Sequence, residues 1–441
     1  MSLRAPARAR RRSELALMLM AGLITVGAYV LVAFGRTASL PADLLPFFGQ
    51  MLLLLAVTHV ATRKLARFAD PTLVPLAVLL NGLGFVVIAR LSNRLAGLQA
   101  TWTLVGVAAF VATLLIVRDV ERLTRNKWTL ALLGVFLLLL PFVPGIGRNI
   151  NGSRIWIRVA SLSFQPGEAA KVVLAIFLAA YLAERRALLS VATWKVGPLR
   201  LPEPRHIGPL LAAWALSVAI MVGQKDLGSS ILFLALFVTL MWLATARLAY
   251  PAIAGVLFSG AAYAAYRMEF GQVFTRVQIW LDPWADAQGK GYQLVQSAFS
   301  FAAGGVTGTG LGLGSPTRIP EVKNDFIFVA IAEELGLLGA TAVLIAFMLF
   351  VGSGLRVAVR AERVFSKLLA AGLTTIVGVQ AFVIIGGVVR VVPLTGVMLP
   401  FVSYGGSSLL ANYVLLALLV RISDQSGRAA AERDAALEGA P

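Results

Sequence analysis

Long apolar segments, separated by shorter stretches that contain charges, proline or glycine, run through the whole chain. Twelve of these segments are close to the roughly 20 residues that an α-helix needs to cross the hydrocarbon core of a bilayer. They lie at about residues 14–35, 45–62, 71–89, 101–117, 128–145, 168–184, 208–224, 227–246, 250–266, 326–352, 368–389 and 407–421. The pattern predicts an all-α polytopic membrane protein with about twelve transmembrane helices.

Two of the segments that connect these spans are long, at about residues 146–167 and 268–325. A structureless loop as long as the second one, between the ninth and tenth spans, is unusual. Its residues 292–301 are apolar in a helix-like pattern, so we expect this loop to fold back on the membrane surface. The last stretch, 424–441, is rich in Ala, Glu and Arg and predicts a loose tail or a frayed helix.

The distribution of basic residues predicts the orientation of the chain. With a cytoplasmic N-terminus, 25 Lys and Arg residues fall on the cytoplasmic side and 13 on the other side, with Lys171 inside a span. Cytoplasmic loops carry the excess of positive charge in membrane proteins. We therefore expect a multi-pass membrane protein with both termini in the cytoplasm, and the loop 268–325 outside the cytoplasm.

Composition agrees with this architecture. Of the 441 residues, 59% are hydrophobic and only 14% are charged, whereas soluble domains contain about 25% charged residues. The net charge of +18 could suggest nucleic-acid binding, but most of the basic residues lie in the loops that set the orientation. The chain has no cysteine and only two histidines, His59 and His206, which excludes disulfides and thiolate zinc sites.

Ionisable residues at or within the predicted spans gather toward their outer ends. They are Glu168, Lys171, Lys225, Asp226, Asp325, Glu333, Glu334 and Arg390. Such charges are costly in a membrane and mark candidate functional sites. Their position suits a substrate with an external polar part and a lipid tail, whereas a transporter would place charges at the midplane. Two structural alternatives stay open: Glu168 and Lys171 could form a packing ion pair, and Asp325 could be an N-cap.

The first long loop carries a second candidate site. Arg154 and Arg158 flank Trp156, and two guanidinium groups beside an aromatic ring suit a phosphate or pyrophosphate group. An aromatic belt with cations reaching to the interface is the alternative. The glycine-rich stretch 304–314 resembles a phosphate-binding loop only superficially, because no βαβ unit surrounds it. We interpret it as a flexible, closely packed loop that leads to Asp325.

Taken together, five motifs resemble the SEDS family, the RodA/FtsW peptidoglycan glycosyltransferases. The motifs are Asn151–Arg158; Gln165–Glu168 with Lys171; Gln224–Gly228; Ile319–Phe328 with Glu333–Gly336; and Pro393–Gly396 followed by Pro400–Ser408. Their order and spacing agree over about residues 71–421. Departures from the family pattern are Gly167, Lys225, Lys323, Asn324, Ile384 and Arg390.

The resemblance implies an enzyme that polymerises lipid II, an undecaprenyl-pyrophosphate-linked disaccharide-peptide, at the outer face of the membrane during cell elongation or division. It implies that Asp325 is the catalytic carboxylate, suited to act as a general base. The substrate-binding residues that it implies are Arg154, Trp156, Arg158, Glu168, Lys171, Asp226, Glu333 and Ser403. A divalent cation, Mg²⁺ or Mn²⁺, at Asp325 stays open.

The resemblance also implies a partner, a class B penicillin-binding protein that cross-links the new strands as a transpeptidase. It divides the chain into an N-terminal arm with two additional helices (1–66), a ten-helix core (67–423) and a cytoplasmic tail (424–441), and the short tail favours a RodA-like protein. Two other functions stay open. A lipid II flippase would need polar lining through the full depth of the membrane, and a non-catalytic scaffold would use its charges only for packing.

Overall fold

A computed structural model describes residues 7–40, 44–150, 152–159, 162–190, 194–196, 199–201, 204–268 and 271–438. Asn151 of the first motif lies outside these residues, as do both ends of the chain. Each of the twelve predicted spans lies mainly within one α-helix, which confirms the predicted fold class. The chain forms two compact units: Met1–Val117, Glu269–Ser353 and Gln380–Pro441 in the first, and Arg118–Met268 and Gly354–Val379 in the second.

Nine helical segments in the described part of the chain are long and apolar enough to cross a membrane. They are Arg11–Thr37, Leu44–Leu65, Leu73–Leu91, Asn93–Ile116, Val120–Phe142, Leu227–Thr245, Ile327–Arg360, Val364–Val388 and Gly406–Leu437. The other three predicted spans are helices α6 (Pro166–Ser190), α7 (Pro204–Gly223) and α9 (Ala249–Arg267). Helix α6 has five charged residues, which weakens its apolar signal although most of it is buried.

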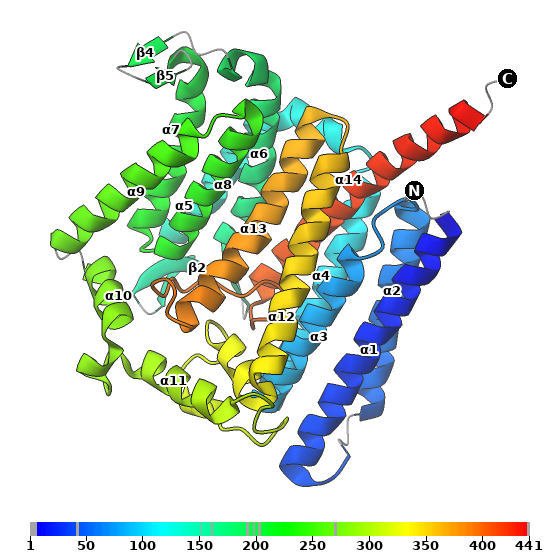
Figure 1. Ribbon diagram of the computed structural model, residues 1–441, viewed down its shortest axis with the longest axis vertical. Helices are drawn as coiled ribbons and strands as arrows, with labels where there is room; N and C mark the ends of the chain where they lie inside the picture. The colour runs from blue at the N-terminus through cyan, green and yellow to red at the C-terminus, as the bar shows by residue number, and fades with distance from the viewer. Residues whose placement is uncertain are drawn as a thin grey trace. The chain divides into compact units, whose positions relative to one another are not determined.

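The first unit contains both ends of the chain and the second long loop. Its helices are α1 (Ala7–Thr37), α2 (Leu44–Leu65), α3 (Leu73–Leu91), α4 (Asn93–Ile116), α10 (Gly271–Leu281), α11 (Tyr292–Gly304), most of α12 (Ile327–Arg360) and α14 (Gly406–Glu438). Helices α1 and α2 form an antiparallel pair, and α1 packs along α3 (Figure 1). The helix predicted at 292–301 is confirmed as α11.

Helix α14 packs against α4 and is fixed by a buried arginine. The Arg421 guanidinium donates to the carbonyl oxygens of Leu65 (2.6 Å) and Val117 (2.8 Å), at the ends of α2 and α4, and pairs with Asp424 (3.3 Å). Carbonyl groups at the C-terminal end of a helix lack hydrogen-bond donors within the helix, and the Arg421 guanidinium donates to them instead. Residues 424–438, expected as a loose tail or frayed helix, continue α14, and Asp424 is buried.

Helix α12 (Ile327–Arg360) is interrupted at Gly336, whose backbone has φ 64° and ψ −165°. The glycine-rich stretch 304–314 fills the break. The amides of Leu337 and Leu338 donate to the carbonyls of Gly305 (3.0 Å) and Val306 (3.2 Å). These bonds give acceptors to amide groups that have none within the interrupted helix. This stretch is therefore closely packed, as the sequence suggested, but its role is to complete a discontinuous helix.

The second unit is built around α6, whose residues 170–182 are mostly buried. Its other helices are α5 (Lys127–Leu139), α7, α8 (Leu227–Thr245) and α9, and α13 (Val364–Val388) continues from this unit into the first. Five short strands accompany them: β1 (Gly147–Ile150), β2 (Ser153–Val159), β3 (Leu162–Phe164), β4 (Trp194–Val196) and β5 (Leu199–Leu201).

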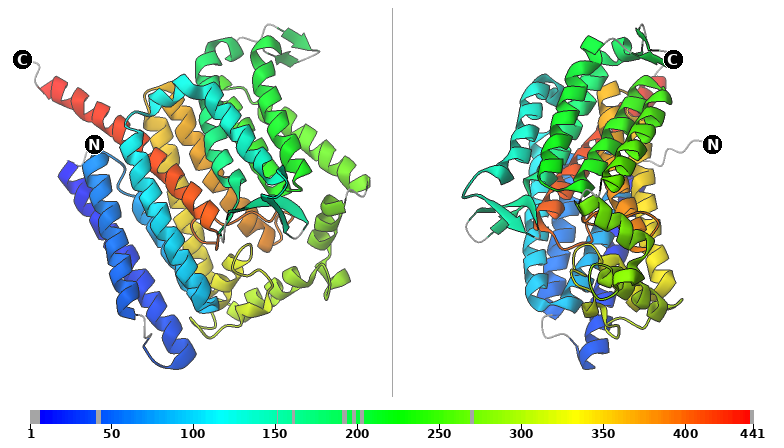
Figure 2. Two further views of the ribbon diagram at one scale, coloured as in Figure 1. Left: turned by 180° about the vertical axis from the view of Figure 1, so that it is seen from behind. Right: turned by 90° about the vertical axis from the view of Figure 1, so that its left-hand side faces the viewer.

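The sequence interpretation did not include these strands. Strands β1, β2 and β3 form an antiparallel sheet in the first long loop, with Arg148 opposite Trp156 and Arg158 opposite Ser163. The sheet extends away from the helices of its own unit (Figure 2). Strands β4 and β5 form a hairpin between α6 and α7.

Candidate functional site

Asp325 lies two residues before the start of α12, in a segment that is held by the last motif. The Ser403 hydroxyl donates to the carbonyl oxygen of Asn324 (2.6 Å), and the amide of Tyr404 donates to the carbonyl oxygen of Lys323 (2.9 Å). Ser403 is buried. The fourth and fifth motifs, about 80 residues apart in sequence, therefore meet and fix the backbone on which Asp325 sits.

The Asp325 carboxyl group faces an arginine of α10. Arg276 donates from Nη1 to the carbonyl oxygen of Thr395 (2.8 Å). A Cβ atom added at Gly396 would lie 3.7 Å from both Arg276 Nη2 and Asp325 Oδ2, so the two charged groups border the same small space. Gly396 has φ +75°, a conformation that favours glycine.

Burial raises the pKa of Asp325 to about 7, and the Arg276 guanidinium limits this rise. A carboxyl group with a pKa near neutral pH is well matched to accept a proton from a hydroxyl group. The N-cap alternative does not match the start of α12, because the helix begins at Ile327 and the residue directly before it is Phe326. The position of Asp325 therefore suits chemistry better than helix capping.

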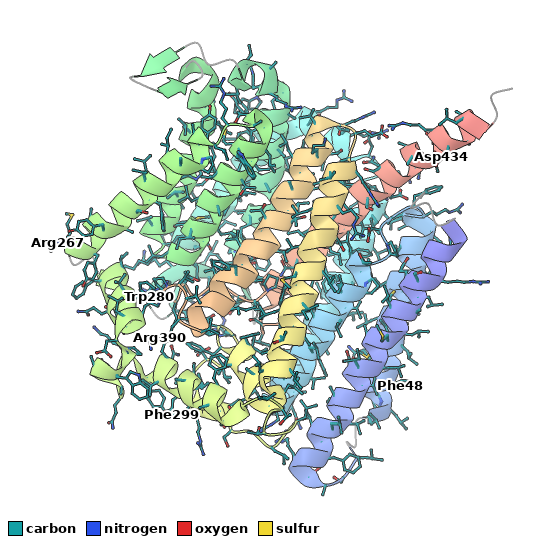
Figure 3. The ribbon with its side chains drawn as sticks, in the orientation of Figure 1. Phe48, Arg267, Trp280, Phe299, Arg390 and Asp434 are labelled. Atoms are coloured by element: carbon teal, nitrogen blue, oxygen red, sulfur yellow. The ribbon has the colours of Figure 1, made fainter. Side chains whose placement is uncertain are left out.

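Helix α10 is attached to the end of α13 by a reciprocal contact. Arg390 donates from Nη2 to the carbonyls of Trp280 (3.0 Å) and Leu281 (2.9 Å), and Trp280 Nε1 donates to the carbonyl of Arg390 (3.0 Å). Figure 3 shows Trp280 and Arg390 next to each other. Arg390 adopts φ 64°, a left-handed backbone conformation that favours glycine. The contact fixes the helix that carries Arg276.

Two acidic residues of α12 bind the glycine-rich stretch. Glu334 Oε1 accepts from Arg90 Nε (2.9 Å) and its Oε2 accepts from the amide of Gly312 (2.9 Å). Glu333 Oε1 accepts from the amide of Ser315 (2.6 Å), while its Oε2 is buried without a hydrogen-bond partner among the described residues. These contacts give both carboxylates a structural role.

In the second unit, Glu168 and Lys171 form a buried ion pair, which is the structural alternative that the sequence left open for these two residues. Lys171 Nζ lies 2.8 Å from Glu168 Oε1, and the side chains are 3% and 5% exposed. Asp226 lies near enough that the Lys171 charge lowers its pKa and the Glu168 charge raises it, but burial dominates and raises the pKa of Asp226 overall. Asp226 also caps α8, because its Oδ1 accepts from the amide of Ser229 (3.0 Å).

The strand that carries Arg154, Trp156 and Arg158 lies beside the third motif. Successive side chains of a strand point to opposite faces, so these three share one face of β2. The amide of Arg154 donates to the carbonyl oxygen of Gln224 (3.1 Å). Arg154 and Arg158 are exposed, whereas Ile157 on the other face is buried. Both guanidinium groups are therefore available to an anionic ligand.

The structure thus sorts the five motifs into two clusters. The first unit brings together Asp325, Ser403 and the α12 carboxylates with Arg276, and the second unit brings together the Glu168–Lys171 pair with Asp226 and the strand of Arg154.

Comparison with known proteins identifies the family. The family described as cell cycle protein FtsW/RodA/SpoVE matches residues 71–428. The chain belongs to this family. Among curated FtsW/RodA/SpoVE relatives, a Mycobacterium tuberculosis protein named peptidoglycan glycosyltransferase RodA is 44% identical over 434 residues, which cover 96% of this chain and 92% of the relative. The probable peptidoglycan glycosyltransferase FtsW of the same organism is 35% identical over 375 residues, 81% of this chain and 68% of the relative.

A solved structure supports the same assignment. It comes from a study of how a peptidoglycan synthase complex coordinates polymerization and crosslinking, and it matches with a TM-score of 0.67 at 25% identity, over 81% of this chain and 98% of that one. The higher identity and coverage of the RodA relative make this member of the FtsW/RodA/SpoVE family more similar to RodA than to FtsW.

Sequence reasoning missed two residues of the first cluster, Arg276 and Trp280. Both lie in the second long loop, where Arg276 was counted only as one of the external basic residues. The signal that could have identified them is the amphipathic pattern of 271–281, which predicts a short interfacial helix with its polar side chains on one face. Only the fold shows that Arg276 lies beside Asp325.

Proposed function

We propose that the protein is a peptidoglycan glycosyltransferase that polymerises lipid II. The observation that carries this proposal is the Asp325 carboxyl group, whose pKa is raised to about 7 and which faces Arg276 close to the start of a membrane-spanning helix. The near full-length similarity to a protein named peptidoglycan glycosyltransferase RodA supports the same activity.

The proposed reaction joins two lipid-linked disaccharide-peptides. A sugar hydroxyl of one molecule attacks the anomeric carbon of the other, a carbon–oxygen bond forms, and the bond to the pyrophosphate oxygen breaks. Asp325 accepts the hydroxyl proton, and undecaprenyl pyrophosphate leaves with the bonding electron pair. The raised pKa of Asp325 makes its carboxylate a stronger base than an exposed aspartate.

Arg276 has a complementary role in this proposal. The leaving pyrophosphate gains negative charge in the transition state, and a fixed guanidinium group stabilises such charge. The bond from Nη1 to Thr395 holds the side chain, while Nη2 borders the space above Gly396. Ser403 and Glu333 support the reacting group through the backbone segments that they bind.

In the second unit, taken by itself, three residues of β2 suit the polar part of a lipid II molecule. We assign pyrophosphate binding to Arg154 and Arg158 and sugar contact to Trp156, because their face of β2 is accessible. Asp226 caps α8 and the buried Glu168 pairs with Lys171, and we propose that these three groups hold the second cluster in shape for the substrate.

A divalent cation at Asp325 fits the described residues poorly. Mg²⁺ and Mn²⁺ prefer several oxygen ligands, and no group of three acidic or histidine side chains that could hold a metal occurs in the described part of the chain. The charge that faces Asp325 is the cationic Arg276. We therefore assign stabilisation of the leaving group to Arg276.

The proposal also includes orientation and partner. The 25 basic residues on one side against 13 on the other favour cytoplasmic termini, which places the loop with Arg276 at the outer face. The partner that we propose is a class B penicillin-binding protein, whose transpeptidase domain would cross-link the strands. The related structure from a peptidoglycan synthase complex supports such an assembly.

The test is reconstitution. The protein and its partner are purified, lipid II is supplied in detergent, and glycan strands are measured for wild type and Asp325→Asn. We expect strands from wild type and none from the variant, with equal thermal stability. Strands that survive the substitution would remove Asp325 as catalyst. Absence of strands from wild type, with transfer of lipid II across vesicles, would favour a flippase, and absence of both would favour a scaffold.

A further inference from the structure

Helices α1 and α2 precede the region 71–428 that the family shares, and the proposed chemistry gives them no task. Helix α1 nevertheless makes close contacts inside the first unit. A Cβ added at Gly82 of α3 would lie 2.1 Å from Oγ1 of Thr25 in α1, so the two helices touch at a distance that only glycine permits. Thr25 is fully buried in this contact.

The C-terminal end of α1 also touches the glycine-rich stretch that fills the break in α12. A Cβ added at Gly35 would lie 2.2 Å from the carbonyl oxygen of Leu311, and one added at Gly312 would lie 2.6 Å from the carbonyl oxygen of Val32. Figure 1 shows this end of α1 beside the loop that precedes α12. Backbone meets backbone here, so no side chain can move aside to relieve a larger residue.

The contacted stretch is tied to the half-helix that carries Asp325 at its start. The amide of Gly312 donates to Glu334 and the amide of Ser315 donates to Glu333. Both acceptors lie in the part of α12 before its break at Gly336. A shift of the loop at Gly312 would therefore pull directly on this half-helix, which is only nine residues long from Ile327 to Leu335.

We propose that α1 is a positioning element of the active site, which holds the glycine-rich loop in the break of α12 through the Gly35–Leu311 contact. The inference rests on the proposed polymerase activity. Gly35 touches no substrate and acts through the loop, Glu334 and the half-helix that follows Asp325. Displacement of a reacting group by about 1 Å can cost up to a hundredfold in rate, so a contact this tight is sufficient to control turnover.

A plain alternative is that α1 is only an additional membrane anchor. The helix itself supplies a matched control, because a Cβ added at Gly27 would meet no atom within 4 Å. Gly27→Val and Gly35→Val make the same change in intrinsic helix preference within the same helix. Only the second forces a side chain against the Leu311 carbonyl. An anchor would tolerate both variants equally.

The experiment measures strand formation from lipid II by the full-length protein with its partner, together with thermal unfolding. For Gly35→Val we expect kcat to fall by about ten- to a hundredfold, with KM for lipid II nearly unchanged. Gly27→Val should retain the wild-type kcat. Hydrogen exchange provides a second readout: the amides of Leu337 and Leu338, bonded to the loop, should exchange faster only in Gly35→Val.

Each outcome decides the proposal. Equal kcat in the two variants, or an equal loss in both, would overturn it. If Gly35→Val does not fold, Gly35→Ala is used with the same expectation, because its methyl group meets the same carbonyl; failure of both to fold would show a role in folding and would refute positioning. If wild type forms no strands, the proposed activity fails, while the exchange measurement still tests whether α1 holds the loop.

Discussion

The buried pair of Glu168 and Lys171 allows a quantitative test of how the second cluster is stabilised. Lys171→Met removes the cation that lies 2.8 Å from Glu168 Oε1, in side chains no more than 5% exposed. It leaves two acidic groups near each other, the buried Glu168 and the partly buried Asp226, without the cation that offsets their charges. Glu168→Gln instead leaves Lys171 near the remaining carboxyl group of Asp226. The two substitutions therefore have unequal consequences.

The magnitudes follow from the burial of the charges. Removal of one member of a buried ion pair costs about 3–5 kcal/mol, because the other charge loses its counter-ion without regaining water. We expect Lys171→Met to lower the free energy of unfolding by that amount and Glu168→Gln by clearly less. The double substitution should recover more than half of the loss, since Glu168 Oε2 has no hydrogen-bond partner among the described residues and the pair is imperfectly satisfied.

The assay is denaturant or thermal unfolding of the purified protein in detergent. Glu184→Gln is the matched control: Glu184 also lies in α6 and pairs with Lys127, but its side chain is 50% exposed. An exposed pair contributes about 1 kcal/mol or less. The reasoning would be refuted if Lys171→Met cost no more than Glu184→Gln, or if the double substitution were less stable than Lys171→Met alone.

Further predictions concern the first unit. Strand formation should rise with pH through about 7 as Asp325 loses its proton. Because folding raises the pKa of Asp325 from 3.8 to about 7, the stability of the protein should fall as the pH rises between these two values, so Asp325→Asn should be inactive yet no less stable than wild type at pH 8. Arg276→Ala should move the midpoint of the activity profile to higher pH, because the guanidinium holds the pKa of Asp325 down; an unchanged midpoint would contradict this. Arg421→Ala should lower the free energy of unfolding by about 3–5 kcal/mol, because Asp424 stays buried without its main counter-ion, and a melting temperature equal to wild type would be the contrary result. Strand formation should persist in EDTA, and its loss would assign Mg²⁺ or Mn²⁺ a role.

Much of the architecture followed from the sequence because membrane insertion depends on local properties. A span needs about 20 consecutive apolar residues, so each predicted span depended on a single window of the chain. The same locality exposed the scarce charges Glu168, Lys171, Asp226 and Asp325, since a charge beside an apolar run stands out without any knowledge of packing. Family membership was also readable, from five short motifs in order.

Other features depended on contacts between distant segments. The period-two pattern of residues 153–159, with Arg154, Trp156 and Arg158 on one face, is a local strand signal, but without a partner strand it could not be told from an interfacial loop. The break in α12 at Gly336 requires acceptors from the loop at 304–314, which lies too far away along the chain for a local sequence pattern to reveal the contact.

The candidate site shows the same division. Asp325 was recognisable as a candidate from the chain alone, because it stands at the start of a span within one of the five motifs. Its neighbours were not: Arg276, Ser403 and the contact between α1 and the glycine-rich loop come from distant segments that only the fold brings together. The pKa and the position of a carboxyl group depend on its burial and on such neighbours, and neither can be read from the order of residues along the chain.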